Sequence, residues 1–112
     1  MKKRLKARIG IETVGGVFAV ILARRTPLPC EKAEVFTTAD DDQSEIKIRV
    51  FQGNAASTSR RRMRELGEFR IVGIPPARRG TPKVEVVFSV TLDGVFGLRA
   101  TDVTSGIELA IS

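Results

Sequence analysis

The sequence predicts an all-β domain, an antiparallel β-sandwich of seven to eight short strands. Apolar and polar residues alternate over 45–50 and again over 84–90, which is the period of a half-buried strand. Turn residues recur at short intervals, as at 93–94 and 105–106. No stretch of helical length has an apolar stripe with the period of an α-helix. Short strands with regularly spaced turns are typical of a sandwich.

The first half of the chain contains three expected strands. An apolar, β-rich run over 14–23 ends at Arg25-Thr26-Pro27. A second strand, 34–39, leads into the acidic turn 40–42, and the alternating strand 46–50 ends at Gly53-Asn54. These boundaries predict strands joined by loops of ordinary length.

The second half begins with a polar segment, 55–65, which has four arginines within 60–64 and no apolar stripe. It is expected to be a solvated loop, with phosphate binding as the alternative. A strand follows over 67–71, and the prolines of 75–82 then make a rigid connection that no helix can cross. Strands 84–90 and 95–100 are expected to form a hairpin through Asp93-Gly94. The last strand is expected over 107–111.

The net charge of +6 is concentrated at the N-terminus. The first eight residues contain five basic side chains and no acidic one, and the remaining residues are close to neutral. We therefore expect a basic N-terminal arm, 1–8, followed by one folded domain, 9–112. The arm is interpreted as a solvated tail, or as a weak contact for polyanions.

The residue types present argue against an enzyme. There is no histidine, which removes the commonest general base and most zinc sites. The adjacent acids Asp40-Asp41-Asp42 lack the spacing of a calcium loop. No catalytic residue, metal or cofactor is therefore expected. The only cysteine, Cys30, predicts a reduced thiol and a cytoplasmic protein, and the apolar run 15–23 is too short to span a bilayer.

Four segments, taken in order, carry a resemblance to a known family. They are Gly10-Ile11-Glu12-Thr13-Val14-Gly15-Gly16-Val17; the run 35–53, which begins Val35-Phe36-Thr37-Thr38; Leu66-Gly67-Glu68-Phe69 with 73–82; and 84–88 with Asp93-Gly94 and Ala100. Over residues 9–112 this ordered set resembles the substrate-binding β-sandwich domain of the DnaK-type, seventy-kilodalton heat-shock chaperones.

The resemblance implies a module that binds extended apolar segments of unfolded polypeptides. Such a module hydrogen-bonds the peptide backbone and offers an apolar pocket to one side chain. The residues that match the family's pocket are Ile11, Phe36, Ile46, Ile48 and Val84; those that match its arch over the peptide are Val14 and Ala39; and those that match its peptide-backbone contacts are Thr13, Thr37 and Gln43. Pattern alone would assign the five pocket residues to ordinary core.

The chain also departs from the family's pattern. Its first seven residues cannot serve as the family's apolar linker from an ATPase domain, and the sequence stops at Ser112, before a helical lid. Arg79 and Asp41 match or lie near the positions that latch the lid. We therefore expect passive peptide binding without ATP-driven switching. The alternatives are a structural or self-association domain with a vestigial channel, including a homo-oligomer formed through the channel or a sheet edge, and a weak polyanion binder. Nucleic acid and membrane are not expected partners.

Overall fold

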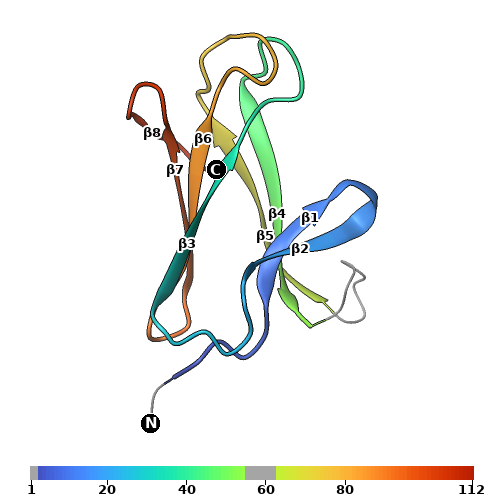
Figure 1. The fold of residues 1–112 in the computed structure, drawn as a ribbon, viewed down its shortest axis with the longest axis vertical. Helices are drawn as coiled ribbons and strands as arrows, with labels where there is room; N and C mark the ends of the chain where they lie inside the picture. The colour runs from blue at the N-terminus through green and yellow to red at the C-terminus, as the bar shows by residue number, and fades with distance from the viewer. Residues whose placement is uncertain (1–2, 55–62) are drawn as a thin grey trace.

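A computed structural model describes residues 3–54 and 63–112, which form two antiparallel sheets packed as a β-sandwich (Figure 1). The first sheet has the order β2-β1-β4-β5 and the second the order β3-β6-β7-β8. The strands are β1 (Ile9–Thr13), β2 (Val17–Leu22), β3 (Cys30–Phe36), β4 (Glu45–Gly53), β5 (Met63–Val72), β6 (Val84–Val90), β7 (Phe96–Asp102) and β8 (Glu108–Leu109). The predicted all-β sandwich of seven to eight strands is confirmed.

Helical structure is confined to one short turn in the described part of the chain. This 3₁₀ turn, η1 (Val14–Gly16), connects β1 to β2. Within the ranges 3–54 and 63–112, no helix is long and apolar enough to cross a membrane.

The core lies between the two sheets and follows the predicted alternation. In β6 the four alternate residues from Val84 to Val90 are at most 3% exposed. In β4, Ile46, Ile48 and Val50 face the same core, while Lys47 points to solvent. The period-two pattern therefore identified the inward face of both strands.

Both predicted turns are present. Gly94 has a positive φ of 85°, and its N–H donates to the Thr91 carbonyl at 2.9 Å, which closes the β6–β7 hairpin. Gly106, with φ of 74°, donates to the Asp102 carbonyl at 2.8 Å between β7 and β8. In each turn glycine occupies a left-handed conformation that other residues adopt only with strain.

Several predicted boundaries were wrong. The strand expected over 14–23 starts at Val17, because Gly15 and Gly16 have positive φ values that interrupt it. The strand expected over 34–39 runs over Cys30–Phe36 instead. Its polar start hid it, since β3 is an edge strand of its sheet and several of its residues are exposed.

The prediction of a loop over the arginine-rich segment 55–65 was wrong for its last three residues. Residues 63–65, expected in a loop, belong to β5. Met63 is 6% exposed and packs with Phe18 and Phe51 in a small cluster separate from the main core. A register shift between Val50 and Phe51 lets both of these consecutive residues be buried. The rest of the predicted loop, 55–62, lies outside the described residues.

The N-terminal residues are paired with the body of the sandwich. Leu5 is 4% exposed and belongs to the main core. Its N–H donates to the Thr26 carbonyl at 2.9 Å, and its carbonyl accepts from Arg25 at 2.8 Å. The division of the chain at residue 8 stays a prediction, but Leu5 lies in the packed body. The side chains of Lys3 and Lys6 remain exposed.

Candidate functional site

The five residues predicted to form a pocket come from both sheets and lie in one apolar cluster. Ile11 is on β1, and Ile46 and Ile48 are on β4. Phe36 on β3 faces Val84 on β6 as its register partner. Residues separated by up to 73 positions in the sequence are therefore brought together where the two sheets meet.

Burial divides these five residues into two groups. Ile46, Ile48 and Val84 are 8%, 4% and 1% exposed and form part of the core. Ile11 and Phe36 are half-buried and pack against that core. Ile11 and Phe36 are thus the members of the set that an added ligand can contact without opening the core. Their contact with a peptide side chain stays a prediction.

The connection between β3 and β4 contains Ala39, one of the two predicted arch residues. The Gln43 side chain holds this connection from inside. Its Oε1 accepts from the Ala39 and Asp40 N–H groups at 2.9 and 3.1 Å, and its Nε2 donates to the Glu45 carbonyl at 2.7 Å. Gln43, predicted to contact a bound peptide, therefore fixes the shape of the loop that presents the exposed Ala39.

The other predicted contacts, Thr13 and Thr37, lie at the end of β1 and on the β3–β4 connection. Thr13 Oγ1 donates to the Val17 carbonyl at 3.1 Å across the β1–β2 hairpin. Thr37 Oγ1 donates to the Pro82 carbonyl at 2.6 Å. Each hydroxyl proton is used within the chain, and each oxygen keeps acceptor capacity for a peptide N–H. The backbone of Val14 lies in η1, while its side chain lies outside what the structure describes.

The β3–β4 connection is also clasped by the proline-rich segment 75–82. The Gly80 N–H donates to both the carbonyl and the Oγ1 of Thr38, at 3.0 and 3.2 Å. Asp41 Oδ1 accepts from the Arg79 N–H at 3.0 Å, and the Asp42 N–H donates to the Ala77 carbonyl at 2.8 Å. Thr38 is 4% exposed. Its supporting role was missed because only the tertiary fold brings it to Gly80.

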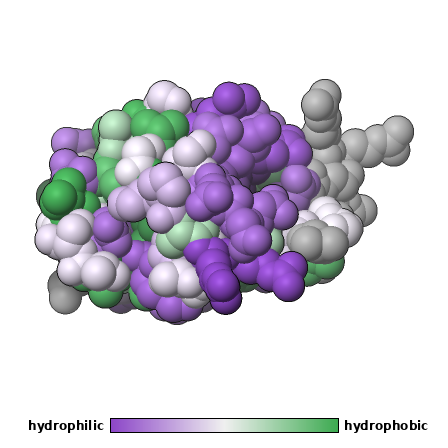
Figure 2. All heavy atoms as spheres, turned by 90° about the horizontal axis from the view of Figure 1, so that it is seen from above, coloured by the Kyte–Doolittle hydropathy of each residue, from purple (hydrophilic) through white to green (hydrophobic). Residues whose placement is uncertain are grey.

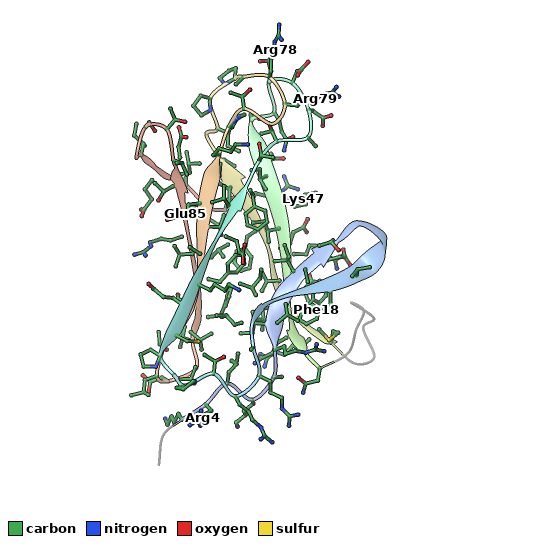
Figure 3. All side chains as sticks on the ribbon, in the orientation of Figure 1. Arg4, Phe18, Lys47, Arg78, Arg79 and Glu85 are labelled. Carbon is green, nitrogen blue, oxygen red and sulfur yellow. The ribbon has the colours of Figure 1, made fainter. Side chains whose placement is uncertain are left out.

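Both polar and apolar side chains are exposed at the end of the sandwich formed by the β3–β4 connection and the segment 75–82. Arg78 and Arg79 project outward from the segment 75–82 (Figure 3). Figure 2 looks down on the same end, with hydrophilic residues over its middle and right and hydrophobic patches toward the left. The β7–β8 connection lies on the left in Figure 1, and its Val103 and Ile107 are 53% and 64% exposed.

An ion-pair network that the sequence did not reveal joins β1, β4 and β5. Arg49 Nη1 lies 2.8 Å from Glu12 Oε1, and its Nη2 and Nε lie 3.0 and 3.3 Å from the two Glu65 carboxylate oxygens. The hydrogen bonds that Arg49 donates to Glu65, followed by the charges of both carboxylates, raise the pKa of the Arg49 guanidinium despite partial desolvation. Its cation also lies 5.1 Å from the ring centre of Phe51. The alternation of residues in the sequence predicted that Arg49 lies on the outer face of its strand. Its partners lie on two other strands, and they can be identified only when the register between the strands is known.

A separate cavity lies at the opposite end, near Arg4 and the 93–94 turn. Its volume is about 740 Å³, and it is lined by none of the ten predicted site residues. Within the residues that the structure describes, no group of three or more His, Cys, Asp or Glu side chains is placed to hold a metal ion.

The chain is similar to known chaperones. The family model described as "Hsp70 protein" matches residues 5–112. Chaperone protein DnaK of Thermosipho melanesiensis is 46% identical over 100 residues, which cover 89% of this chain and 16% of that protein. The aligned region is thus a small part of the relative. Together with the confirmed sandwich, these matches show that the chain belongs to the Hsp70 family.

Proposed function

We propose that this chain binds extended apolar segments of unfolded polypeptides, at the site between the β1–β2 and β3–β4 connections. The observation that carries the proposal is that the five predicted pocket residues lie in one apolar cluster. Ile11 and Phe36 are half-buried against the cluster that contains the buried Ile46 and Val84, and the exposed Ala39 stands on a loop fixed by hydrogen bonds. The proposal assigns passive binding, and no chemical reaction, to these 112 residues.

The backbone and the side chains of the peptide make different contacts in this proposal. Its backbone groups, common to all sequences, hydrogen-bond to the connections, and one apolar side chain packs against Ile11 and Phe36. Burying a leucine-sized side chain contributes about 1.5–3 kcal/mol. The small size of this gain favours weak binding with rapid release. A cytoplasmic site of action belongs to the same proposal, supported by a single cysteine that cannot form an intramolecular disulfide.

The test is fluorescence anisotropy of a labelled, leucine-rich heptapeptide titrated with the protein. A charge at Ile46 or Val84 would threaten the core, so the variants are chosen at accessible positions. Ala39→Tyr adds bulk to the predicted arch, and Ala33→Tyr places the same side chain on an exposed position of β3. We expect saturable binding that Ala39→Tyr weakens and Ala33→Tyr leaves unchanged.

A second pair of variants tests the pocket itself. Phe36 is half-buried and its neighbour Val35 is 58% exposed. Adjacent residues of a strand point to opposite faces, so Phe36→Ser should lower the affinity while Val35→Ser does not. Circular dichroism and thermal unfolding establish that each variant is folded. Equal binding by all four folded variants would contradict the proposed site.

Self-association is a second candidate, favoured by one observation. β2 is an edge strand with the sequence Val-Phe-Ala-Val-Ile-Leu and no charged residue, and its Val17 and Val20 are 53% and 40% exposed. Such an edge can pair with the same strand of another copy. Sedimentation velocity of the same samples separates the candidates. Dimers that form with rising concentration, in protein that binds no heptapeptide, would favour self-association.

A further inference from the structure

The cavity of about 740 Å³ at the end opposite the proposed peptide site is the feature that this function does not use. It lies where the N-terminal residues cross the sandwich beside the β6–β7 hairpin. Figure 3 shows Arg4 at this end and Arg78 and Arg79 at the other. The volume of the cavity falls within the range of small-molecule sites, roughly 300–1,000 Å³.

The floor of the cavity is apolar. Leu5, Ile9 and Val90, which are buried in the core, contribute to its lining. The half-buried rings of Phe69 and Phe96 also line it, with their centres 5.9 Å apart and their planes tilted by 50°. A hydrocarbon chain lying on this surface would remove apolar area from water.

The rim of the cavity is cationic. Lys3, Arg4, Lys6 and Arg64 line it, with Asp93 as the acidic member. No ion pair within the described ranges involves any of these four cations. Arg4 Nη1 donates to the Arg25 carbonyl at 3.1 Å, which orients the guanidinium and leaves its other N–H groups for a ligand. The positive charge at this rim is therefore available to an anion.

We infer that this cavity binds a small amphipathic anion, in which an alkyl chain carries one carboxylate, sulfate or phosphate head. The chain lies on the apolar floor, and the head is held by the cations of the rim. A polyphosphate would leave the floor without a partner, and a neutral hydrocarbon would leave the rim without one. The inference does not depend on peptide binding, because the two sites lie at opposite ends.

Decanoate is the probe, and isothermal titration calorimetry with the full 112-residue chain is the measurement. We expect saturable one-to-one binding that weakens with salt. Octanoate, shorter by two methylene groups, should bind roughly tenfold more weakly. Decyltrimethylammonium, with the same chain length and the opposite charge, should show no saturable binding.

Matched surface variants locate the site without disturbing the core. Lys3→Glu/Lys6→Glu should lower decanoate affinity roughly fivefold or more. Arg78→Glu/Arg79→Glu makes the same change of charge at the far end and should leave the affinity unchanged. Leu92 lines the cavity and is 52% exposed, so Leu92→Ser should weaken binding by about threefold. Val103→Ser, at a residue of similar exposure outside the cavity, should not.

Equal weakening by both double-charge variants would reduce the effect to net charge and overturn the site. Equal affinity for decanoate and decyltrimethylammonium would overturn the role of the cations. Binding to phosphatidylglycerol vesicles without binding of decanoate would make the surface a membrane contact and overturn the cavity as a site for a single amphiphile. A leucine-rich heptapeptide should not displace decanoate, and displacement would place both ligands in one site.

Discussion

Cys30 illustrates how its surroundings set the chemistry of a single residue. It begins β3 and packs, half-buried, against the main core. Burial raises the pKa of its thiol above the ordinary value of 9.0, and a hydrogen bond with the Val90 backbone offsets part of this effect. Since the thiolate is the reactive form, a raised pKa keeps the thiol protonated and unreactive at neutral pH.

This pKa leads to a prediction about stability and pH. Below the unfolded-state pKa the thiol is neutral in both states, so its contribution to stability is complete. As the pH rises past 9, the unfolded chain ionises first and that contribution is lost. We expect urea titrations between pH 7 and 10 to show a steeper fall in the free energy of unfolding for the wild type than for Cys30→Ser. Identical slopes would contradict the raised pKa.

Residue-scale features were predictable in part. The alternation around Ile46 and Val84 identified them as inward-facing, whereas Ala39, expected at the end of a strand, lies in the connection after β3. Residue types and order were sufficient for the first two residues. The partners of Arg49 and Gln43 could not be predicted, because each hydrogen bond depends on loop geometry or on the register between strands distant in sequence.

At the scale of elements, Gly10 explains how closely β1 and β2 pack. It faces Val20 across the pair, next to a register irregularity at Ile9. A Cβ atom built on Gly10 would overlap the backbone oxygen of Ala19 and approach the Phe18 ring to 2.9 Å. The obstacle is largely backbone, so it cannot move aside without disturbing the pairing of the two strands.

We therefore expect Gly10→Ala to be strongly destabilising, toward the upper end of the 1–3 kcal/mol typical of overpacking. Gly94→Ala is the comparison. Its added Cβ meets no atom within 4 Å, but its φ is +85°, so it should cost only about 1 kcal/mol of conformational strain. Chemical denaturation of the two variants measures the difference. A smaller loss for Gly10→Ala than for Gly94→Ala would show that β1 and β2 can separate cheaply.

The strands themselves were predicted with different success. β6 matched its predicted limits because its alternation is regular and its turn carries Asp-Gly. The starts of β3 and β5 were missed because their exposed faces are polar, as the sequence of a loop also is. Pairing with β6 and β4, rather than local propensity, makes these segments strands.

At the scale of the whole molecule, the N-terminal segment helps to close the sandwich. Leu5 reaches the main core, and residues 3–5 pair with the segment between β2 and β3. We expect Leu5→Ala to lower the free energy of unfolding by about 2–5 kcal/mol, and Lys6→Ala to change it by no more than about 0.5 kcal/mol. Thermal and urea unfolding test this. Equal, small effects would return the segment to the solvated tail expected from its charge.

The sequence by itself determined the fold class, the inward faces of β4 and β6, the turns at Gly94 and Gly106, and the family. These depend on periodicity, on glycine's tolerance of positive φ and on the order of motifs, all of which are local or linear properties. Only the tertiary structure decided that Thr38 supports the β3–β4 connection, that Arg49 joins three strands, and that Leu5 and Phe96 line one cavity. Each of these depends on two sheets meeting in a particular register, and register is set by packing across the whole sandwich.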